Sequence, residues 1–473
     1  MQPVLLLDVV GLTQAQISPE ITPHLHALGQ RGSIAPMDSI LPAVTCSAQA
    51  TMLTGTMPSE HGVVGNGWRD PKSFEVALWR QSNALVRGEK VYEAAKKLDP
   101  SFTCAKLFWW WNMGAAVDLS ITPRPFYPAD GRKIPAIYAW PPEFGEETEA
   151  ALGKFPFFDF WGPKAGLPSS RWIADAAIRT LREKRPTLTM AYLPHLDYDH
   201  QRFGPKAPRS IEALREIDVI VGDLVAAADE TGAAVIVVSE YGITEVSKPV
   251  HLNLALRKAG LLHARKTPNG DVLDPFGSRA FALVDHQIAH IYTQDDAATA
   301  EARRVLEGVD GVQSILDAEG QRAAGLDHPN SGDLVVQSDP DAWFTYYYWE
   351  DPAAEPDFAR TVDIHRKPGY DPLEMFLDPG IKVPMLRVAR RLAQKKLGFR
   401  YLMDLIPTDA TLIRGSHGLV PEDPAEGPVW LSSLPFSASS TAGPQGTSAP
   451  GDSGTIPMTS VKARVLAALQ RPD

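Results

Sequence analysis

Cysteine is nearly absent from this sequence, which contains only Cys46 and Cys104 among its 473 residues. Two cysteines are too few for a disulfide-stapled scaffold or a cysteine-rich zinc site. We expect two thiols in a reduced compartment rather than a single bridge. The N-terminus also lacks the basic start and the long apolar stretch of a secretory leader, because Asp8 interrupts its apolar run. We therefore expect a cytoplasmic protein.

Long apolar runs and an excess of basic charge are missing too. The longest apolar runs, such as 4–7 and 233–238, have strand length and fall far below the ~20 residues that a membrane-spanning helix needs. Lys and Arg number 46 against 57 Asp and Glu, a formal net charge of −11. This balance argues against a surface that binds duplex nucleic acid. A small phosphorylated substrate stays possible, because a local metal or a helix N-terminus can attract an anion.

Strand and helix patterns alternate along the chain. Apolar runs at 4–10, 188–193 and 233–238 predict buried strands, and amphipathic patterns at 210–228 and 252–262 predict helices. Such alternation is typical of an α/β protein with a doubly wound sheet and helices on both faces. In these folds the functional groups lie just beyond the carboxyl ends of the strands.

Composition divides the chain into a core and two atypical regions. Residues 105–170 are rich in aromatic residues and proline, and we interpret them as a loop-rich, cap-like insertion beside the strand ends. From 431 to 473, Ser, Thr, Gly, Ala and Pro dominate, which predicts a disordered low-complexity tail, with a short helix possible at 461–469. Residues 1–104 and 171–430 then form the α/β core.

Acidic side chains follow three predicted strands. Asp8 lies near the end of the first strand, Asp197 follows the strand at 188–193, and Glu240 follows the strand at 233–238. The carboxyl ends of parallel strands meet at one edge of a sheet. We therefore expect these three carboxylates to lie near one another.

The segment around Thr45 predicts the start of a helix. Residues 48–53 have a helical pattern, which places Thr45 at or near the first turn. Free amides and the helix dipole attract anions there and lower the pKa of a nucleophile. Taken alone, Thr45 is equally interpretable as a helix cap.

The residues that follow extend this pattern into a motif. A Thr-Gly lies at 54–55, a His-Gly-Val at 61–63, Asn66 comes next, and a Gly-Ser-His-Gly that includes His417 lies at 415–418. Together with Thr45, these residues resemble the type I phosphodiesterase/nucleotide pyrophosphatase family of the alkaline phosphatase superfamily. In that family a nucleophilic Thr opens a helix, and the Thr-Gly, His-Gly and Asn motifs follow at this spacing.

The resemblance implies an alkaline-phosphatase-like fold and a metal-dependent hydrolase. Its substrates would contain phosphodiester, pyrophosphate or related phosphoryl and phosphonate bonds, cleaved through a phospho-threonine intermediate. Carried over to this chain, Thr45 is the nucleophile, Asn66 hydrogen-bonds a phosphoryl oxygen, and Asp197 and His417 bind one of two zinc-like ions. The implied partner is a small phosphorylated molecule; the oligomeric state is not readable from the sequence.

Three positions depart from the family pattern. Val10 stands where the family has its first-strand Asp, Gln201 where the Asp-x-x-x-His motif has its His, and Tyr241 where Asp-His-Gly has its His. A neutral amide or phenol binds zinc poorly. The alternative function is therefore a degraded family member that binds a phosphorylated ligand or a protein partner without turnover.

Other side chains could rebuild the metal site. Asp8 points to the same side of its strand as Val10, and Glu240 replaces the Asp of Asp-His-Gly. Among the spare histidines, which include His286, we favour His365 in the polar, turn-rich stretch 362–371. The candidate metal ligands are thus Asp8, Asp197, Glu240, His365 and His417. They would hold one or two divalent ions, Zn²⁺ or, in a histidine-poor site, Mn²⁺, Mg²⁺ or Ca²⁺.

Overall fold

A nine-stranded sheet forms the centre of the computed structural model, which describes residues 1–129, 132–436 and 454–471. Its strand order is β21-β2-β20-β9-β1-β8-β5-β6-β7. The strands are β1 (Val4–Val9), β2 (Ser33–Asp38), β5 (Cys104–Leu107), β6 (Leu119–Pro123), β7 (Ile137–Trp140), β8 (Leu188–Leu193), β9 (Ala234–Val238), β20 (Val429–Ser432) and β21 (Ile456–Pro457). The middle strands β9, β1, β8, β5 and β6 are parallel, so their carboxyl ends share one edge.

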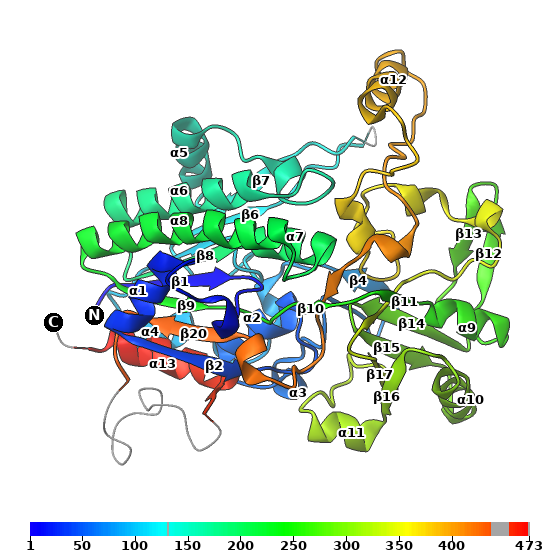
Figure 1. Ribbon diagram of the computed structural model, residues 1–473, viewed down its shortest axis with the longest axis horizontal. Helices are drawn as coiled ribbons and strands as arrows, with labels where there is room; N and C mark the ends of the chain where they lie inside the picture. The colour runs from blue at the N-terminus through cyan, green and yellow to red at the C-terminus, as the bar shows by residue number, and fades with distance from the viewer. Residues whose placement is uncertain (130–131, 437–453, 472–473) are drawn as a thin grey trace.

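Helices cover both faces of this sheet (Figure 1). On one face lie α1 (Pro23–Arg31), α6 (Leu167–Glu183) and α8 (Pro208–Thr231), and on the other lie α2 (Thr45–Thr54), α4 (Val91–Leu98) and α13 (Val461–Leu469). The middle strands are buried along their whole length, since apolar runs such as that of β1 have a helix layer on either side. The predicted doubly wound α/β fold is confirmed.

A second, smaller unit is inserted between β9 and β20 (Figure 1). Its antiparallel sheet has the order β14-β15-β17-β16 and its own apolar core. The strands are β14 (Ala280–Asp285), β15 (Ile288–Thr293), β16 (Val312–Leu316) and β17 (Leu334–Ser338), and α9 (Leu252–Lys258) and α10 (Asp296–Glu307) pack on them. The turn between β14 and β15 brings residues 285–287 to the strand-end edge of the large sheet.

The shorter elements connect these units. The helices are α3 (Pro58–His61), α5 (Pro142–Leu152), α7 (His195–Phe203), α11 (Ala318–Ala323) and α12 (Pro384–Lys396). The strands are β3 (Gly67–Arg69), β4 (Val76–Leu78), β10 (Thr244–Glu245), β11 (Lys248–Val250), β12 (Ala264–Thr267), β13 (Gly270–Leu273), β18 (Ala342–Phe344) and β19 (Gly415–Ser416). Across the described ranges, no helix combines the length and the apolar character needed to cross a bilayer.

The predicted domain boundaries differ from the structure in two places. The region 105–170 is not separate from the core, because β5, β6 and β7 are strands of the central sheet and Trp109 and Trp111 are buried beside it. Many of its aromatic side chains, Trp109 and Trp111 among them, are core side chains rather than parts of a cap. The inserted unit lies instead between β9 and β20.

The tail is the second difference. Disorder was predicted for 431–473 apart from a possible short helix at 461–469. That helix is present as α13, but β20 also pairs with β9 through Ser432, and β21 is ordered. Val465 and Leu469 of α13 are fully buried, and the helix packs on α4 and α2. This apolar burial fixes a segment whose neighbouring composition is low in complexity. Residues 437–453 lie outside the described part of the chain.

Candidate functional site

Thr45 is the first residue of α2, as the sequence predicts. Its side chain is almost fully buried, with 4% of its surface exposed. The Thr45 hydroxyl lies 3.3 Å from the Tyr241 hydroxyl, and Thr45 is close enough to the Glu240 carboxyl group to lower its pKa. The nucleophile candidate therefore lies beside two residues that follow β9.

Asn66 lies beside the start of α2, again as predicted. Its Oδ1 accepts a hydrogen bond from the Cys46 backbone N–H (3.0 Å), next to Thr45. Its backbone N–H and its Nδ2 both donate to Asp285, at 2.8 and 3.0 Å. Burial raises the pKa of Asp285 to about 7, against the lowering effect of these two hydrogen bonds. Sequence reasoning missed Asp285, because it comes from the inserted unit and belongs to no motif.

A buried pair of carboxyl groups, Asp8 and Glu240, lies on one side of Thr45. The Gln49 Nε2 donates to Asp8 Oδ2 (3.2 Å) and to Glu240 Oε1 (2.6 Å). The Trp110 backbone N–H donates to Gln49 Oε1 (2.5 Å), which fixes the orientation of the amide. The other two oxygens, Asp8 Oδ1 and Glu240 Oε2, are buried without a hydrogen-bond partner. This Asp8–Glu240 pair thus has two open oxygens.

The proton content of the Asp8–Glu240 pair follows from its burial. Loss of solvation and the neighbouring Glu240 raise the pKa of Asp8 well above its usual range. Burial likewise raises the pKa of Glu240 to about 7. Two carboxyl groups this close do not both ionise easily, so the pair holds one proton at neutral pH. A divalent cation would favour loss of that proton.

Asp197 forms a second carboxylate centre, on the other side of Tyr241. Gln201, one turn further along α7, donates its Nε2 to Asp197 Oδ2 (2.8 Å), and the Tyr241 hydroxyl donates to Asp197 Oδ1 (3.2 Å). His417 Nε2 lies 3.9 Å from Asp197 Oδ1. Burial raises the pKa of Asp197 to about 6. We call Asp197 with Gln201, Tyr241 and His417 the Asp197 centre.

His417 is neutral and has a defined tautomer. Its Nδ1 lies 2.7 Å from the Ala43 carbonyl oxygen, which can only accept a hydrogen bond. The proton is therefore on Nδ1, and Nε2 carries a lone pair towards Asp197. Burial lowers the pKa of His417 to about 3.

Four aromatic rings stack beside the Asp197 centre. The Tyr241 and His417 ring centroids are 3.5 Å apart and their planes are within 8° of parallel. His286 follows at 3.6 Å from His417, and Tyr370 at 3.8 Å from His286. His286 has φ of +61°, a left-handed conformation that costs energy in a residue other than glycine. The turn that carries His286 is thus held in place by its packing.

The structure does not bring His365 to the site. His365 is exposed, whereas the other candidate site residues are buried. The cause is the buried Lys367 two residues later, whose ammonium group lies 2.7 Å from both Asp371 and Glu374. This ion cluster anchors the stretch so that Tyr370 points inward, where its hydroxyl donates to Gln201 Oε1 (3.0 Å). Of the spare histidines, His286 lies at the site instead.

A two-zinc centre fits these residues poorly. Within the described residues, no three His, Cys, Asp or Glu side chains meet in a way that could hold a metal ion. Gln201 and Tyr241 donate hydrogen bonds to Asp197, so neutral donors satisfy both oxygens of that carboxylate. The Asp8–Glu240 pair differs, because its two open oxygens suit one oxygen-coordinated ion.

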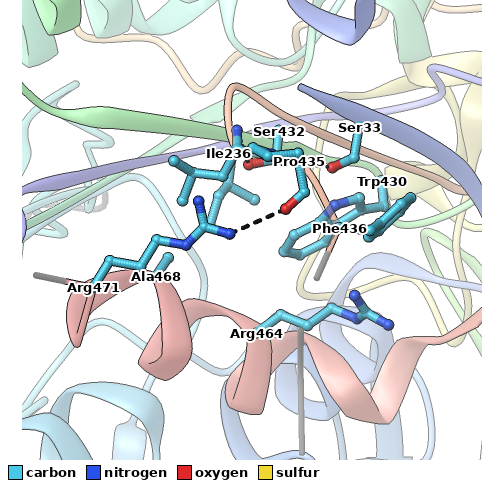
Figure 2. Close-up of a pocket in the computed structure, with 10 residues that line it drawn as sticks. Ser33, Ile236, Trp430, Ser432, Pro435, Phe436, Arg464, Ala468 and Arg471 are labelled. Atoms are coloured by element: carbon cyan, nitrogen blue, oxygen red, sulfur yellow. Dashed lines mark hydrogen bonds between the residues drawn. The ribbon is translucent and has the colours of Figure 1, made fainter. Parts of the chain in front are cut away.

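A small pocket elsewhere in the molecule is not part of the site. It lies between β20 and α13, where Trp430, Phe436, Arg464 and Arg471 line it (Figure 2). Its volume of about 30 Å³ is that of a water molecule. None of the candidate site residues lines it.

Comparison with known proteins identifies the chain. A family model described as type I phosphodiesterase/nucleotide pyrophosphatase matches residues 4–371. The chain belongs to this family. Membership agrees with the family resemblance that the motifs around Thr45 indicated.

Individual relatives of this family member are distant. It is 24% identical over 227 residues to an uncharacterised pyrophosphatase/phosphodiesterase of Schizosaccharomyces pombe, a match that covers 47% of this chain and only 40% of the yeast protein. Phosphonoacetate hydrolase from Sinorhizobium meliloti, solved with phosphonoformate, superposes with a TM-score of 0.60 at 15% identity. That match covers 99% of this chain and 96% of the hydrolase.

An animal relative has the same fold. Murine ectonucleotide pyrophosphatase/phosphodiesterase 5, solved with AMP, gives a TM-score of 0.58 at 13% identity. The match covers 100% of this chain and 96% of the murine chain. At such low identity these two structures establish the fold and leave the substrate of this family member open.

Proposed function

We propose that this chain hydrolyses phosphoester, pyrophosphate or phosphonate bonds of a small phosphorylated molecule, with Thr45 as the nucleophile. The observation that carries the proposal is the Thr45 hydroxyl at the start of α2, 3.3 Å from the Tyr241 hydroxyl and beside the Glu240 carboxyl group, whose pKa it lowers. A carboxylate with a pKa of about 7 is well matched to accept a proton near neutral pH. Family membership supports the same reaction class.

The proposed reaction has two steps. In the first, Thr45 Oγ1 forms a bond to phosphorus, the hydroxyl proton passes to Glu240 and on to the leaving group, and the bond from phosphorus to the leaving group breaks. In the second, a water oxygen attacks phosphorus, Glu240 takes a proton from that water and gives it to Thr45 Oγ1, and the bond to Thr45 Oγ1 breaks. The threonine hydroxyl is then restored and the phosphate or phosphonate product leaves.

Asn66 and Asp285 position the phosphoryl group in this proposal. One N–H of the Asn66 amide donates to Asp285, and its other N–H is free to donate to a phosphoryl oxygen. Asp285 also accepts the Asn66 backbone N–H, so the amide is fixed before the substrate arrives. Asp285 is thus a positioning residue that acts through Asn66.

One divalent cation fits this site better than two zinc ions. Asp8 and Glu240 would hold it with the oxygens that now have no partner. When bound, such an ion supplies positive charge that lowers the pKa of the Thr45 hydroxyl and offsets the charge of the phosphoryl group. The hard, oxygen-seeking ions Mg²⁺, Mn²⁺ and Ca²⁺ match an all-oxygen site.

Aromatic side chains near the site favour a substrate with an aromatic or apolar group. Trp79 lies between Trp110 and Tyr370, with ring centroids at 5.5 and 6.2 Å, and Trp161 lies 5.7 Å from Tyr370. These rings adjoin Gln49 and Gln201, which contact the two carboxylate centres. A planar or apolar leaving group could pack against them.

The experiment is hydrolysis of bis(4-nitrophenyl) phosphate with added Mg²⁺, Mn²⁺ or Zn²⁺. We expect Thr45→Ala to lose turnover, Thr45→Ser to keep a measurable part of it, and Thr56→Ala, just beyond α2, to match the wild type. Intact-protein mass spectrometry of acid-quenched wild type should detect one added phosphoryl group that Thr45→Ala lacks. Wild-type turnover by Thr45→Ala would remove Thr45 from the reaction.

A binding function without turnover is the second candidate. It rests on the hydrogen bonds that Gln201 and Tyr241 donate to Asp197, where the family has metal-bound imidazoles. This candidate predicts no hydrolysis with any added ion, together with binding of inorganic phosphate that Asn66→Ala abolishes. Isothermal titration with phosphate, run beside the assay above, distinguishes the two functions.

A further inference from the structure

A basic amphipathic helix lies outside the site and has no role in the proposed reaction. The segment 377–405 projects from the body of the molecule, and α12 lies at its outer tip (Figure 1). The two ends of this segment meet at a neck, where the Asp378 N–H donates to the Leu405 carbonyl (2.8 Å) and the Leu405 N–H to the Arg360 carbonyl (3.0 Å). No residue of α12 is buried.

The apolar side chains of this segment face solvent. Met385 and Leu386 are 69% and 67% exposed, and Leu397 and Phe399, just after α12, are 72% and 65% exposed. Met385 and Leu392 lie two turns apart on the same side of the helix. Single exposed apolar residues are common on protein surfaces, but a group of neighbouring ones marks an interaction surface for a protein, a membrane or a ligand.

The arginine side of α12 faces inward instead. Arg387 and Arg391 both pair with Asp404 in the returning chain. This pairing turns the apolar side outward, the reverse of a helix that packs on a core. The orientation is therefore built by specific ion pairs, and the apolar side packs on none of the residues that the structure describes.

The charge of the segment identifies the partner. Residues 378–404 contain seven Lys and Arg against two Asp, in a chain whose net charge is −11. Arg390 lies beside Leu386, so cations and apolar side chains alternate over one small surface. A surface helix with these properties is suited to the boundary between lipid headgroups and acyl chains, where Lys and Arg side chains reach the phosphates.

We propose that α12 and the turn after it dock this protein onto an anionic lipid surface. Met385, Leu386, Leu392, Leu397 and Phe399 enter the headgroup region. Exposed cations of the segment, among them Arg390 and Lys395, which lies over the Tyr401 ring, bind lipid phosphates. Arg387 and Arg391 hold the helix in position through Asp404. Docking is peripheral, and it does not depend on the proposed hydrolysis.

The test is co-sedimentation of the full chain with vesicles. We expect binding to vesicles of phosphatidylcholine and phosphatidylglycerol in equal parts, and much weaker binding to phosphatidylcholine alone. Salt should weaken binding, since the Debye length is about 8 Å at physiological ionic strength. Arg390→Gln and Lys395→Gln should each weaken binding by about fivefold, and Leu386→Glu with Leu392→Glu should abolish it.

Matched controls separate this surface from the rest of the molecule. Arg215→Gln and Lys258→Gln remove exposed cations from α8 and α9, and Val219→Glu changes a valine that is 56% exposed on α8. None of these should alter vesicle binding. All variants concern exposed side chains, so unchanged thermal unfolding is expected and checks that each is folded.

A second measurement places the segment at the lipid. Both native cysteines are buried, so Leu397→Cys provides one accessible thiol for an environment-sensitive dye. We expect the emission to rise and shift to the blue with anionic vesicles only. Three results would overturn the proposal: equal binding to both vesicle types, binding unaffected by the α12 variants, or no binding with a self-association that Leu386→Glu abolishes. The last would assign the surface to a second copy of the chain.

Discussion

The two carboxylate centres beside Thr45 differ in what satisfies their oxygens. In the Asp197 centre both oxygens accept hydrogen bonds, from Gln201 and from Tyr241. In the Asp8–Glu240 pair, the Gln49 amide donates a hydrogen bond to one carboxyl oxygen of each residue. The other oxygen of each residue has no hydrogen-bond partner. Neutral donors can thus satisfy both oxygens of one buried carboxylate, whereas two adjacent carboxylates need a proton or a cation. The pair is where we expect the chemistry and the ion.

Removal of a carboxylate from each centre should give the largest effect. We expect Glu240→Gln to lower kcat by about 10²–10⁴-fold, because the group that accepts the Thr45 proton is lost. Asp197→Asn should lower kcat less, since Asp197 contacts Thr45 only through Tyr241. The nitrophenyl assay measures both. A larger loss for Asp197→Asn would assign the chemistry to the other centre.

The next effect concerns the number of ions. Titration calorimetry of metal-stripped protein should detect one bound Mn²⁺ or Mg²⁺ per chain. Asp8→Asn should lower the affinity for this ion, and His365→Ala should leave the affinity unchanged. His417→Ala should also leave this ion bound. Two tightly bound zinc ions per chain, lost in His417→Ala, would contradict the distinction between the centres.

The Asp197 centre should be convertible to a zinc site. Gln201→His with Tyr241→His would restore two imidazoles beside Asp197 and His417, which then offer nitrogen and oxygen ligands for zinc. We expect the double variant to bind one Zn²⁺ that the wild type does not retain after dialysis, as measured by elemental analysis. Gln201→Asn with Tyr241→Phe is the matched control and should retain none.

The smallest effect is a pH dependence of stability that originates in the Asp197 centre. The folded pKa of Asp197 is raised to about 6, so between about pH 4 and pH 6 the folded state binds more protons than the unfolded state. The contribution of Asp197 to the free energy of unfolding, roughly 1–3 kcal/mol, is fully present below pH 4 and is lost as the pH rises through 6. The free energy of unfolding of the wild type, measured with denaturant, should therefore fall more over that pH range than the free energy of unfolding of Asp197→Asn. An identical slope would mean that Asp197 keeps an ordinary pKa.

Local sequence patterns predicted much of the core. The runs at 4–10, 188–193 and 233–238 are the strands β1, β8 and β9, because buried parallel strands are continuously apolar. Thr45 and Asn66 lie together as their spacing indicated, since both belong to one short stretch around α2. The aromatic region was misjudged, because composition does not reveal that β5 is covered by distant elements. In the tail, the helix at 461–469 was foreseen, but its packing against α2 and α4 was not.

Beyond these patterns, the sequence determined which residue types are available to the site: Thr45 at a helix start, carboxylates at or just beyond the ends of three strands, and Gln201 and Tyr241 where imidazoles were expected. Only the tertiary structure decided which of them meet. It brings Asp285 and His286 to the site from an insertion more than 200 residues after Asn66. It also anchors Lys367, so that Tyr370 points into the site and His365 points to solvent. The physical reason is that hydrogen bonds and ion pairs between distant segments depend on packing, which no local periodicity records.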